Sequence, residues 1–221
     1  MKKILVIVAH PDDAELGMGM KIKSHTQNGD VVKIIVVTNG EYKDSPKGRI
    51  LEAKKSAKIL GVKELFFLGF SCGHLNEVSD QIRLEIEKII KKEDPDMIYT
   101  IFSKDLHIDH EVVSRQAVTA ARSIPSLVMF RVANSHDFNP NFFFCGGEEL
   151  FRFKIKALSC YKSEIKKRGT IDLVAMKALS KYEIQRYFHH SLVSRIRVNK
   201  KLNNKDNLYF EPFFVERLIS D

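Results

Sequence analysis

Two short segments of the chain are rich in side chains that can hold a metal ion. Residues 9–15 read Ala-His-Pro-Asp-Asp-Ala-Glu, and residues 105–110 read Asp-Leu-His-Ile-Asp-His. Carboxylates brought close together repel one another and are costly to desolvate alone, so a cation is their natural partner. Two imidazoles and one carboxylate are the ligand set of a catalytic zinc ion that keeps a position for water. The residue types therefore predict a catalytic metal site, provided that the fold brings both segments together.

Both segments follow short apolar runs in a regular alternation of strand-like and helix-like patterns. The predicted strands cover residues 4–9, 31–37, 64–68 and 97–102, and the predicted helices cover residues 15–27, 48–60, 78–92 and 108–123. Buried strands separated by helices of this length form βαβ units around a parallel sheet. We therefore expect an α/β fold, a Rossmann-like three-layer sandwich with a mostly parallel sheet. In the usual strand order 3-2-1-4 the first and fourth strands are neighbours, so the two segments should share one crevice at the carboxyl edge.

The remainder of the chain has a looser pattern. We predict a strand at 127–133, an aromatic loop at 142–144, helices at 148–161 and 174–188, and a last strand at 208–215. Residues 134–147 are the most loop-like stretch, and we interpret them as a loop over the site and not as a domain boundary. Residues 1–221 are thus expected to form a single domain.

Composition narrows the class of protein further. With 44% hydrophobic and 29% charged residues, the chain has the balance of a folded protein. Its three cysteines, Cys72, Cys145 and Cys160, form no C-x-x-C pair, so neither a disulfide framework nor a cysteine zinc site is predicted. A cytoplasmic location is expected on this cysteine usage. No apolar run reaches the roughly 18 residues of a membrane span, so no integral membrane segment is expected.

The positive charge is concentrated in one part of the chain. The net charge is +8, and residues 152–205 hold 15 of the 36 Lys and Arg but only 3 of the 28 Asp and Glu. This stretch is either a solvated basic face or a surface that attracts an anionic substrate. No nucleic-acid-binding motif accompanies it, so a nucleic-acid partner is not predicted.

A pair of glycines near the first segment raises the question of nucleotide binding. Gly17-Met18-Gly19 lacks the third glycine of G-x-G-x-x-G and lies one turn inside the predicted helix. Asp12 and Asp13 also occupy the place where a pyrophosphate needs positive potential. The pattern does not predict a dinucleotide site.

Residues 10–19 (HPDDAELGMG) together with residues 107–110 resemble the PIG-L/LmbE-like family of zinc-dependent N-acetyl-sugar deacetylases. Residues 39–41, 49–53 and 209–213 are also similar to that family. The resemblance implies one Zn²⁺ per chain and a small-molecule N-acetylated sugar as substrate. It leaves open an anionic or nucleotide-linked substrate and the formation of a homo-oligomer. It also implies roles for seven residues: zinc ligands His10, Asp13 and His110, general base Asp12, oxyanion stabiliser His107, its orienting partner Asp109, and sugar-binding Arg49.

The chain departs from the pattern of this family at residues 68–73 (LGFSCG). Relatives commonly carry, before the glycine, an aspartate that contacts a sugar hydroxyl, and here Cys72 stands in that place. A thiol makes that contact less well, so the substrate is expected to differ from the family's usual N-acetylglucosaminide.

Two other functions remain open from the sequence. One is a metal-dependent phosphohydrolase that uses the same acids with Mg²⁺, although two imidazoles favour zinc over a hard, oxygen-loving ion. The other is a catalytically silent sugar-binding protein, for which the additional carboxylate of Asp12 has no purpose.

Overall fold

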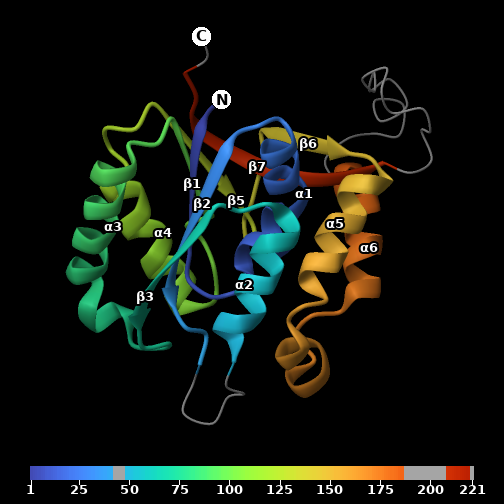
Figure 1. The fold of residues 1–221 in the computed structure, drawn as a ribbon, viewed down its shortest axis with the longest axis horizontal. Helices are drawn as coiled ribbons and strands as arrows, with labels where there is room; N and C mark the ends of the chain where they lie inside the picture. Colours follow the sequence, from blue (N-terminus) through green and yellow to red (C-terminus); the bar gives the residue numbers. More distant parts are fainter. Residues whose placement is uncertain (42–47, 187–207, 220–221) are drawn as a thin grey trace.

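The computed structural model describes residues 1–41, 48–186 and 208–219, and its centre is a seven-stranded sheet in the order β3-β2-β1-β4-β5-β7-β6 (Figure 1). The first five strands are parallel: β1 (Lys3–Val8), β2 (Val31–Thr38), β3 (Glu64–Phe70), β4 (Met97–Ile101) and β5 (Ser126–Phe130). The last strand, β7 (Tyr209–Arg217), runs antiparallel to β5 and also pairs with β6 (Phe142–Gly146). The expected α/β fold with a mostly parallel sheet is confirmed.

Helices cover both faces of the sheet. One face carries α1 (Asp13–Gln27), α2 (Arg49–Leu60), α5 (Glu148–Leu158) and α6 (Leu173–Tyr182), and the other carries α3 (Ser79–Glu93) and α4 (Ile108–Ala120). Short helical turns lie at η1 (Leu75–Val78), η2 (Ser163–Arg168) and η3 (Glu183–Arg186). Because both faces are covered, the central strands β4 and β5 are buried along their whole length. Within the described part of the chain, no helix combines the length and the apolar character that crossing a membrane requires.

The prediction of an aromatic loop at 142–144 is wrong, because these residues open strand β6. Phe143 and Phe144 pair with Pro212 and Glu211 of β7. The partner strand lies more than sixty residues further along the chain, so no local pattern signals the pairing. In place of the predicted helix 174–188, the structure has helix α6, which ends at Tyr182, followed by the short turn η3. Residues 187–205, which include the last two residues of that predicted helix and the end of the basic stretch 152–205, lie outside the described residues.

Helix α1 breaks in its second turn. Met18 has non-helical backbone angles (φ −143°, ψ 28°), and the two flanking glycines allow close approach of neighbouring elements. A Cβ atom on Gly17 would lie 2.1 Å from the Phe130 ring, and one on Gly19 would lie 2.9 Å from the Lys154 side chain. The Gly-Met-Gly pattern therefore shapes a helix kink.

A buried ion pair satisfies the backbone groups that the kink frees. The Glu211 carboxylate accepts hydrogen bonds from the N–H groups of Met20 and Lys21, both at 2.9 Å. The Lys154 ammonium donates to the Leu16 carbonyl and to Glu211, both at 2.8 Å. Strand β7 and helix α5 thus hold the first turn of α1, which carries the residues that follow β1.

Candidate metal centre

The strand order brings the two predicted segments together. Strands β1 and β4 are paired neighbours, so residues 10–13, which follow β1, meet residues 107–110, which begin α4, at the carboxyl edge of the sheet. His107 is the N-cap residue of α4, and its side chain accepts a hydrogen bond from the Asp109 N–H. Asp12 has a φ of 105°, a left-handed conformation that is rare for a residue other than glycine. The expected juxtaposition is present.

Three buried side chains, His10, Asp13 and His110, form what we call the His–Asp–His trio. The Nδ1 atom of His10 lies 3.1 Å from Nε2 of His110. Asp13 Oδ1 lies 3.3 Å from the same His110 nitrogen, and the other carboxylate oxygen, Oδ2, lies 3.6 Å from His10 Nδ1. A tetrahedral zinc ion with bonds of about 2.0–2.1 Å separates its ligand atoms by about 3.3 Å. The three distances lie around that value, so the trio fits such an ion.

The outer nitrogens of both imidazoles face carboxylates. His10 Nε2 is 3.0 Å from Asp109 Oδ2, and His110 Nδ1 is 3.0 Å from Asp105 Oδ1. With a cation bound, each outer N–H would donate to its carboxylate and each inner nitrogen would offer its lone pair to the cation. Two lone pairs and the Asp13 carboxylate then point at one another, an arrangement that a cation stabilises.

The two supporting carboxylates are themselves held by the backbone and by a hydroxyl. The Gly73 N–H donates to Asp109, with a distance of 2.8 Å to the nearer oxygen, and Ser135 Oγ donates to Asp105 at 2.8 Å. Asp109 was expected to orient His107. Its backbone N–H does contact His107 Nδ1 at 3.2 Å, while its carboxylate contacts His10. Asp105 was assigned no role from its residue type, although it lies two residues before His107 in the same segment.

The electrostatics of the trio favour positive charge. Burial opposes charging of His10, but Asp109 and Asp13 outweigh it and raise the pKa of His10 well above its usual value. Burial likewise opposes charging of His110, yet Asp13 and Asp105 raise its pKa to about 9. Burial alone would raise the pKa of Asp13, but the two imidazoles hold it well below the usual value. Surroundings that hold protons on imidazoles in this way also attract a divalent cation.

Asp12 lies beside the trio with a different environment. Its carboxylate accepts a hydrogen bond from the Arg49 guanidinium at 2.9 Å. Burial raises the pKa of Asp12 to about 8, because desolvation, helped by the charge of Asp13, outweighs the attraction of Arg49. Arg49 also donates to the carbonyls of Pro11 (2.5 Å) and Gly40 (2.9 Å) and is only 4% exposed. The structure therefore places Arg49 beneath the turn that carries Asp12.

His107 lies against the trio and is half-buried. Its ring stacks on His110 with centroids 4.7 Å apart and lies at the same distance from the His10 ring. Burial and the two neighbouring imidazoles lower the pKa of His107. Since its Nδ1 accepts the Asp109 N–H, the proton of the neutral ring is on Nε2.

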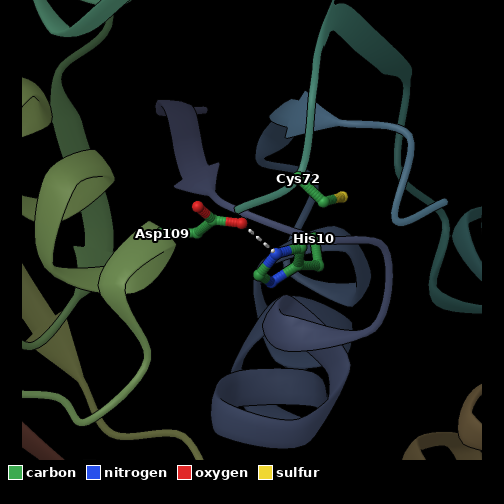
Figure 2. A group of neighbouring side chains, drawn as sticks. All are labelled: His10, Cys72 and Asp109. Atoms are coloured by element: carbon green, nitrogen blue, oxygen red, sulfur yellow. Dashed lines mark hydrogen bonds and ion pairs between the residues drawn. The ribbon is translucent and has the colours of Figure 1, made fainter. Parts of the chain in front are cut away.

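Cys72 approaches His10 from the loop after β3, while Asp109 approaches from α4 (Figure 2). The Cys72 side chain is buried, and its donor atom lies within 4.8 Å of donor atoms of His10 and Asp109. Burial alone would raise the pKa of the Cys72 thiol, but hydrogen bonds with His10 and Thr38 lower it below the usual value. The position of this thiol beside a candidate metal ligand was not expected from sequence, because it depends on the path of the loop after β3.

The fold and the site define an α/β protein whose candidate metal centre contains two histidines and one aspartate, with an additional carboxylate beside it. The model of the PIG-L family, described as GlcNAc-PI de-N-acetylase, matches residues 5–121. The chain belongs to the PIG-L family, as its motifs suggested.

Similar proteins agree with this membership. The chain is 34% identical over 171 residues to the uncharacterized deacetylase YaiS of Escherichia coli (strain K12), covering 73% of this chain and 91% of YaiS. It is 37% identical over 107 residues to the diacetylchitobiose deacetylase of Thermococcus kodakarensis, covering 44% and 40% of the two chains. The crystal structure of the conserved protein TT1542 from Thermus thermophilus has the same fold, with a TM-score of 0.78, 24% identity, and coverage of 100% and 98%. The protein is thus a deacetylase by class, a hydrolase of amide C–N bonds.

Proposed function

We propose that the protein is a zinc-dependent hydrolase that removes an N-acetyl, or similar N-acyl, group from a small-molecule substrate containing an amino sugar. The observation that carries the proposal is the His–Asp–His trio, whose inner donor atoms converge beside the carboxylate of Asp12. The curated relative from Thermococcus is named for the deacetylation of diacetylchitobiose, which supports a sugar-containing substrate. The three cysteines are unpaired, which supports a cytoplasmic location.

His10, Asp13 and His110 would hold one zinc ion per chain. Their donor set of two imidazoles and one carboxylate matches zinc better than Mg²⁺, which prefers oxygen ligands. When bound, zinc polarises the amide carbonyl and lowers the pKa of a water molecule toward about 7. Asp105 and Asp109 keep the outer nitrogens of the two imidazoles occupied, so their inner nitrogens stay available.

Asp12 is the proposed general base. Its carboxylate is close enough to the trio to interact electrostatically with Asp13 and His10. It is not one of the three converging donors, because it is held by an ion pair with Arg49. Burial raises the pKa of this carboxylate to about 8, so it is a stronger base than an exposed aspartate. A cation bound in the trio would lower this pKa, because positive charge nearby favours the ionised carboxylate. Asp12 would therefore accept the proton of the attacking water, and either Asp12 or His107 would protonate the leaving amine.

His107 is the proposed oxyanion donor. Its Nε2 carries the proton of the neutral ring, because Nδ1 already accepts the Asp109 N–H. Its stacking on His110 keeps the ring next to the trio, where the amide oxygen develops negative charge. Loss of one such donor typically raises the barrier by about 3–4 kcal/mol.

Metal analysis combined with two aspartate variants tests the proposal. Asp12→Asn should retain about one zinc per chain and lose on the order of 10²–10⁴ in kcat, because the amide keeps the shape but accepts no proton. Asp13→Asn, the matched control at the neighbouring position, should lose the metal. Release of free amine from N-acetylated sugars, with no phosphate release from phosphate esters, separates the deacetylase from a phosphohydrolase. If Asp12→Asn empties the site while Asp13→Asn leaves it full, the two roles are exchanged.

We also propose that the sugar carries an anionic group such as a phosphate or a nucleotide diphosphate. The support is the basic stretch 152–205, of which Arg152, Lys156 and Lys177 are exposed. Steering by exposed charges weakens with salt, since they are screened over about 8 Å at physiological ionic strength. A phosphorylated N-acetyl sugar should therefore have the higher kcat/KM at low salt, and the advantage over its neutral counterpart should shrink at high salt. Equal values without salt dependence would contradict an anionic substrate.

A further inference from the structure

His10 belongs to two groups of donor atoms, one on each of its ring nitrogens. Its Nδ1 faces Asp13 and His110, whereas its Nε2 faces Asp109 at 3.0 Å. Cys72 lies in the same neighbourhood, and donor atoms of His10, Cys72 and Asp109 are all within 4.8 Å of one another. We call these three side chains the Cys72 group; Figure 2 shows that they come from three separate segments of the chain.

We propose that the Cys72 group is a second metal site, which takes a thiophilic divalent cation such as Cd²⁺ or excess Zn²⁺ and thereby inhibits the enzyme. A thiolate and an imidazole together select soft and borderline cations, and a carboxylate completes a three-ligand set that zinc and its heavier relatives accept. The three side chains are 6%, 7% and 0% exposed, so an ion here loses most of its water and is held by protein atoms.

The geometry of the Cys72 group is close to what such an ion requires. A tetrahedral zinc ion separates a nitrogen and an oxygen ligand by about 3.3 Å and a nitrogen and a sulfur ligand by about 3.6 Å. The nitrogen-to-oxygen distance is 3.0 Å here, and the sulfur lies within 4.8 Å of both other donor atoms. Cys72 and Gly73 are adjacent, and the Gly73 N–H donates to the Asp109 carboxylate at 2.8 Å. One turn after β3 therefore positions both the sulfur and the oxygen.

Occupation of the Cys72 group changes His10. The cation replaces the Nε2 proton that His10 donates to Asp109 and the thiol proton of Cys72; two protons leave, so the net charge of the group is unchanged. His10 would then be an imidazolate shared between two cations, and it would lose the hydrogen bond to Asp109 that supports it as a ligand of the trio. The inhibitory consequence rests on the proposed function, whereas binding of the cation does not.

Absorption spectroscopy tests binding independently of catalysis. The full chain carrying one equivalent of Zn²⁺ is titrated with Cd²⁺ and, in parallel, with Co²⁺, and the sulfur-to-metal charge-transfer band is recorded. We expect the band to develop in the wild type and to disappear in Cys72→Ser. Cys145→Ser and Cys160→Ser are the matched controls, since they remove the two other thiols of the chain, and both should keep the band. Cys72→Ala repeats the comparison if the serine variant is poorly folded.

Amine release from an N-acetylated sugar, measured at rising Zn²⁺ above one equivalent, tests inhibition. Each variant is compared with its own activity at one equivalent, and Cys72→Ser should need at least about tenfold more Zn²⁺ for half-inhibition than the wild type or Cys160→Ser. Absence of the band in the wild type, or its survival in both Cys72 variants, would overturn the site. A band without inhibition of an active enzyme would overturn its inhibitory role. An inactive protein that still shows the Cys72-dependent band would count against the proposed function and in favour of the second site.

Discussion

Carboxylates behind the proposed ligands set the geometry of the metal centre. Asp105 and Asp109 each accept the outer N–H of one imidazole, and each is anchored by a segment distant in sequence, Ser135 in one case and Gly73 in the other. A change at these positions leaves all three donor atoms of the trio in place and alters only how firmly the rings are held.

Asp105→Ala should weaken zinc binding by about 10- to 100-fold, because His110 loses the acceptor that fixes its ring orientation. Competition with a chromophoric chelator measures this affinity directly. Asp80→Ala is a suitable control, since that side chain is 88% exposed on α3, and it should bind zinc like the wild type. Unchanged affinity in Asp105→Ala would mean that Asp105 does not support His110.

Arg49 was expected to bind the sugar, and its buried position suggests another role. Its guanidinium ties the Pro11 carbonyl and the Asp12 carboxylate together across a turn with left-handed backbone at Asp12. We expect Arg49→Lys to lower kcat by about 10- to 100-fold with little change in KM, because a misplaced base costs turnover and not substrate affinity. Steady-state kinetics separate the two parameters. A raised KM at constant kcat would indicate instead that Arg49 contributes to substrate binding.

Residue types and spacing were enough to predict that two segments meet in one metal site, because histidines and aspartates at the ends of adjacent strands are rarely brought together except to bind a cation. The choice of His10, Asp13 and His110 within that site came from the resemblance to the family. The roles of Asp105 and Cys72 could not be derived in the same way. They depend on which ring nitrogen of each histidine faces inward and on the path of the loop after β3, and neither is encoded in local periodicity.

At the scale of elements, the kink in α1 connects residues 10–13, the turn that carries Asp12 and Asp13, to strand β7 near the far end of the sheet. Its freed N–H and carbonyl groups are satisfied by Glu211 of β7 and Lys154 of α5, which are 1% and 2% exposed. A buried pair of this kind is sensitive to the loss of one partner, since the remaining charge is left without compensation.

Lys154→Met should therefore lower the free energy of unfolding by about 3–5 kcal/mol. Urea denaturation at neutral pH measures the change. The control is Arg115→Met, which removes an ion pair with Glu111 whose partners are 65% and 46% exposed, and it should cost about 1 kcal/mol or less. Equal effects of the two substitutions would show that the kink does not depend on Lys154.

The first four strand–helix units could be predicted because each buries its own apolar pattern. Ile82, Ile86 and Ile90, for example, recur every four residues along the buried face of α3. Strand β6 was missed because its stability comes from β7, a partner that no window of local sequence contains.

For the molecule as a whole, His25 links stability to pH. It lies near the end of α1, 2.8 Å from Asp30 and 3.1 Å from the Tyr99 hydroxyl of β4. Burial, helped by the charge of Lys21, lowers the pKa of His25. The neutral imidazole is thus favoured in the folded protein, whereas the unfolded chain takes up a proton near pH 6.5.

Stability due to His25 is present above about pH 6.5 and falls as the pH drops below that value, because there the unfolded state binds more protons. We expect the unfolding free energy of the wild type to decline more steeply between about pH 6.5 and 5 than that of His25→Gln. Urea midpoints across this range give the difference curve, in which titrations common to both proteins cancel. Parallel curves would exclude His25 as a source of acid sensitivity.

The position of β7 between β5 and β6 has a consequence for how the protein is made. Within the described residues, strand β6 pairs with the sheet only through β7, and β7 also supplies Glu211 to the break in α1. During synthesis the ribosome releases residues 1–27 long before residue 211, so residues 10–13 and α1 emerge early but lack their final support. The parallel half of the sheet can form on the nascent chain. The break in α1 therefore gains the carboxylate of Glu211, and with it the buried ion pair to Lys154, only after β7 has emerged late in translation.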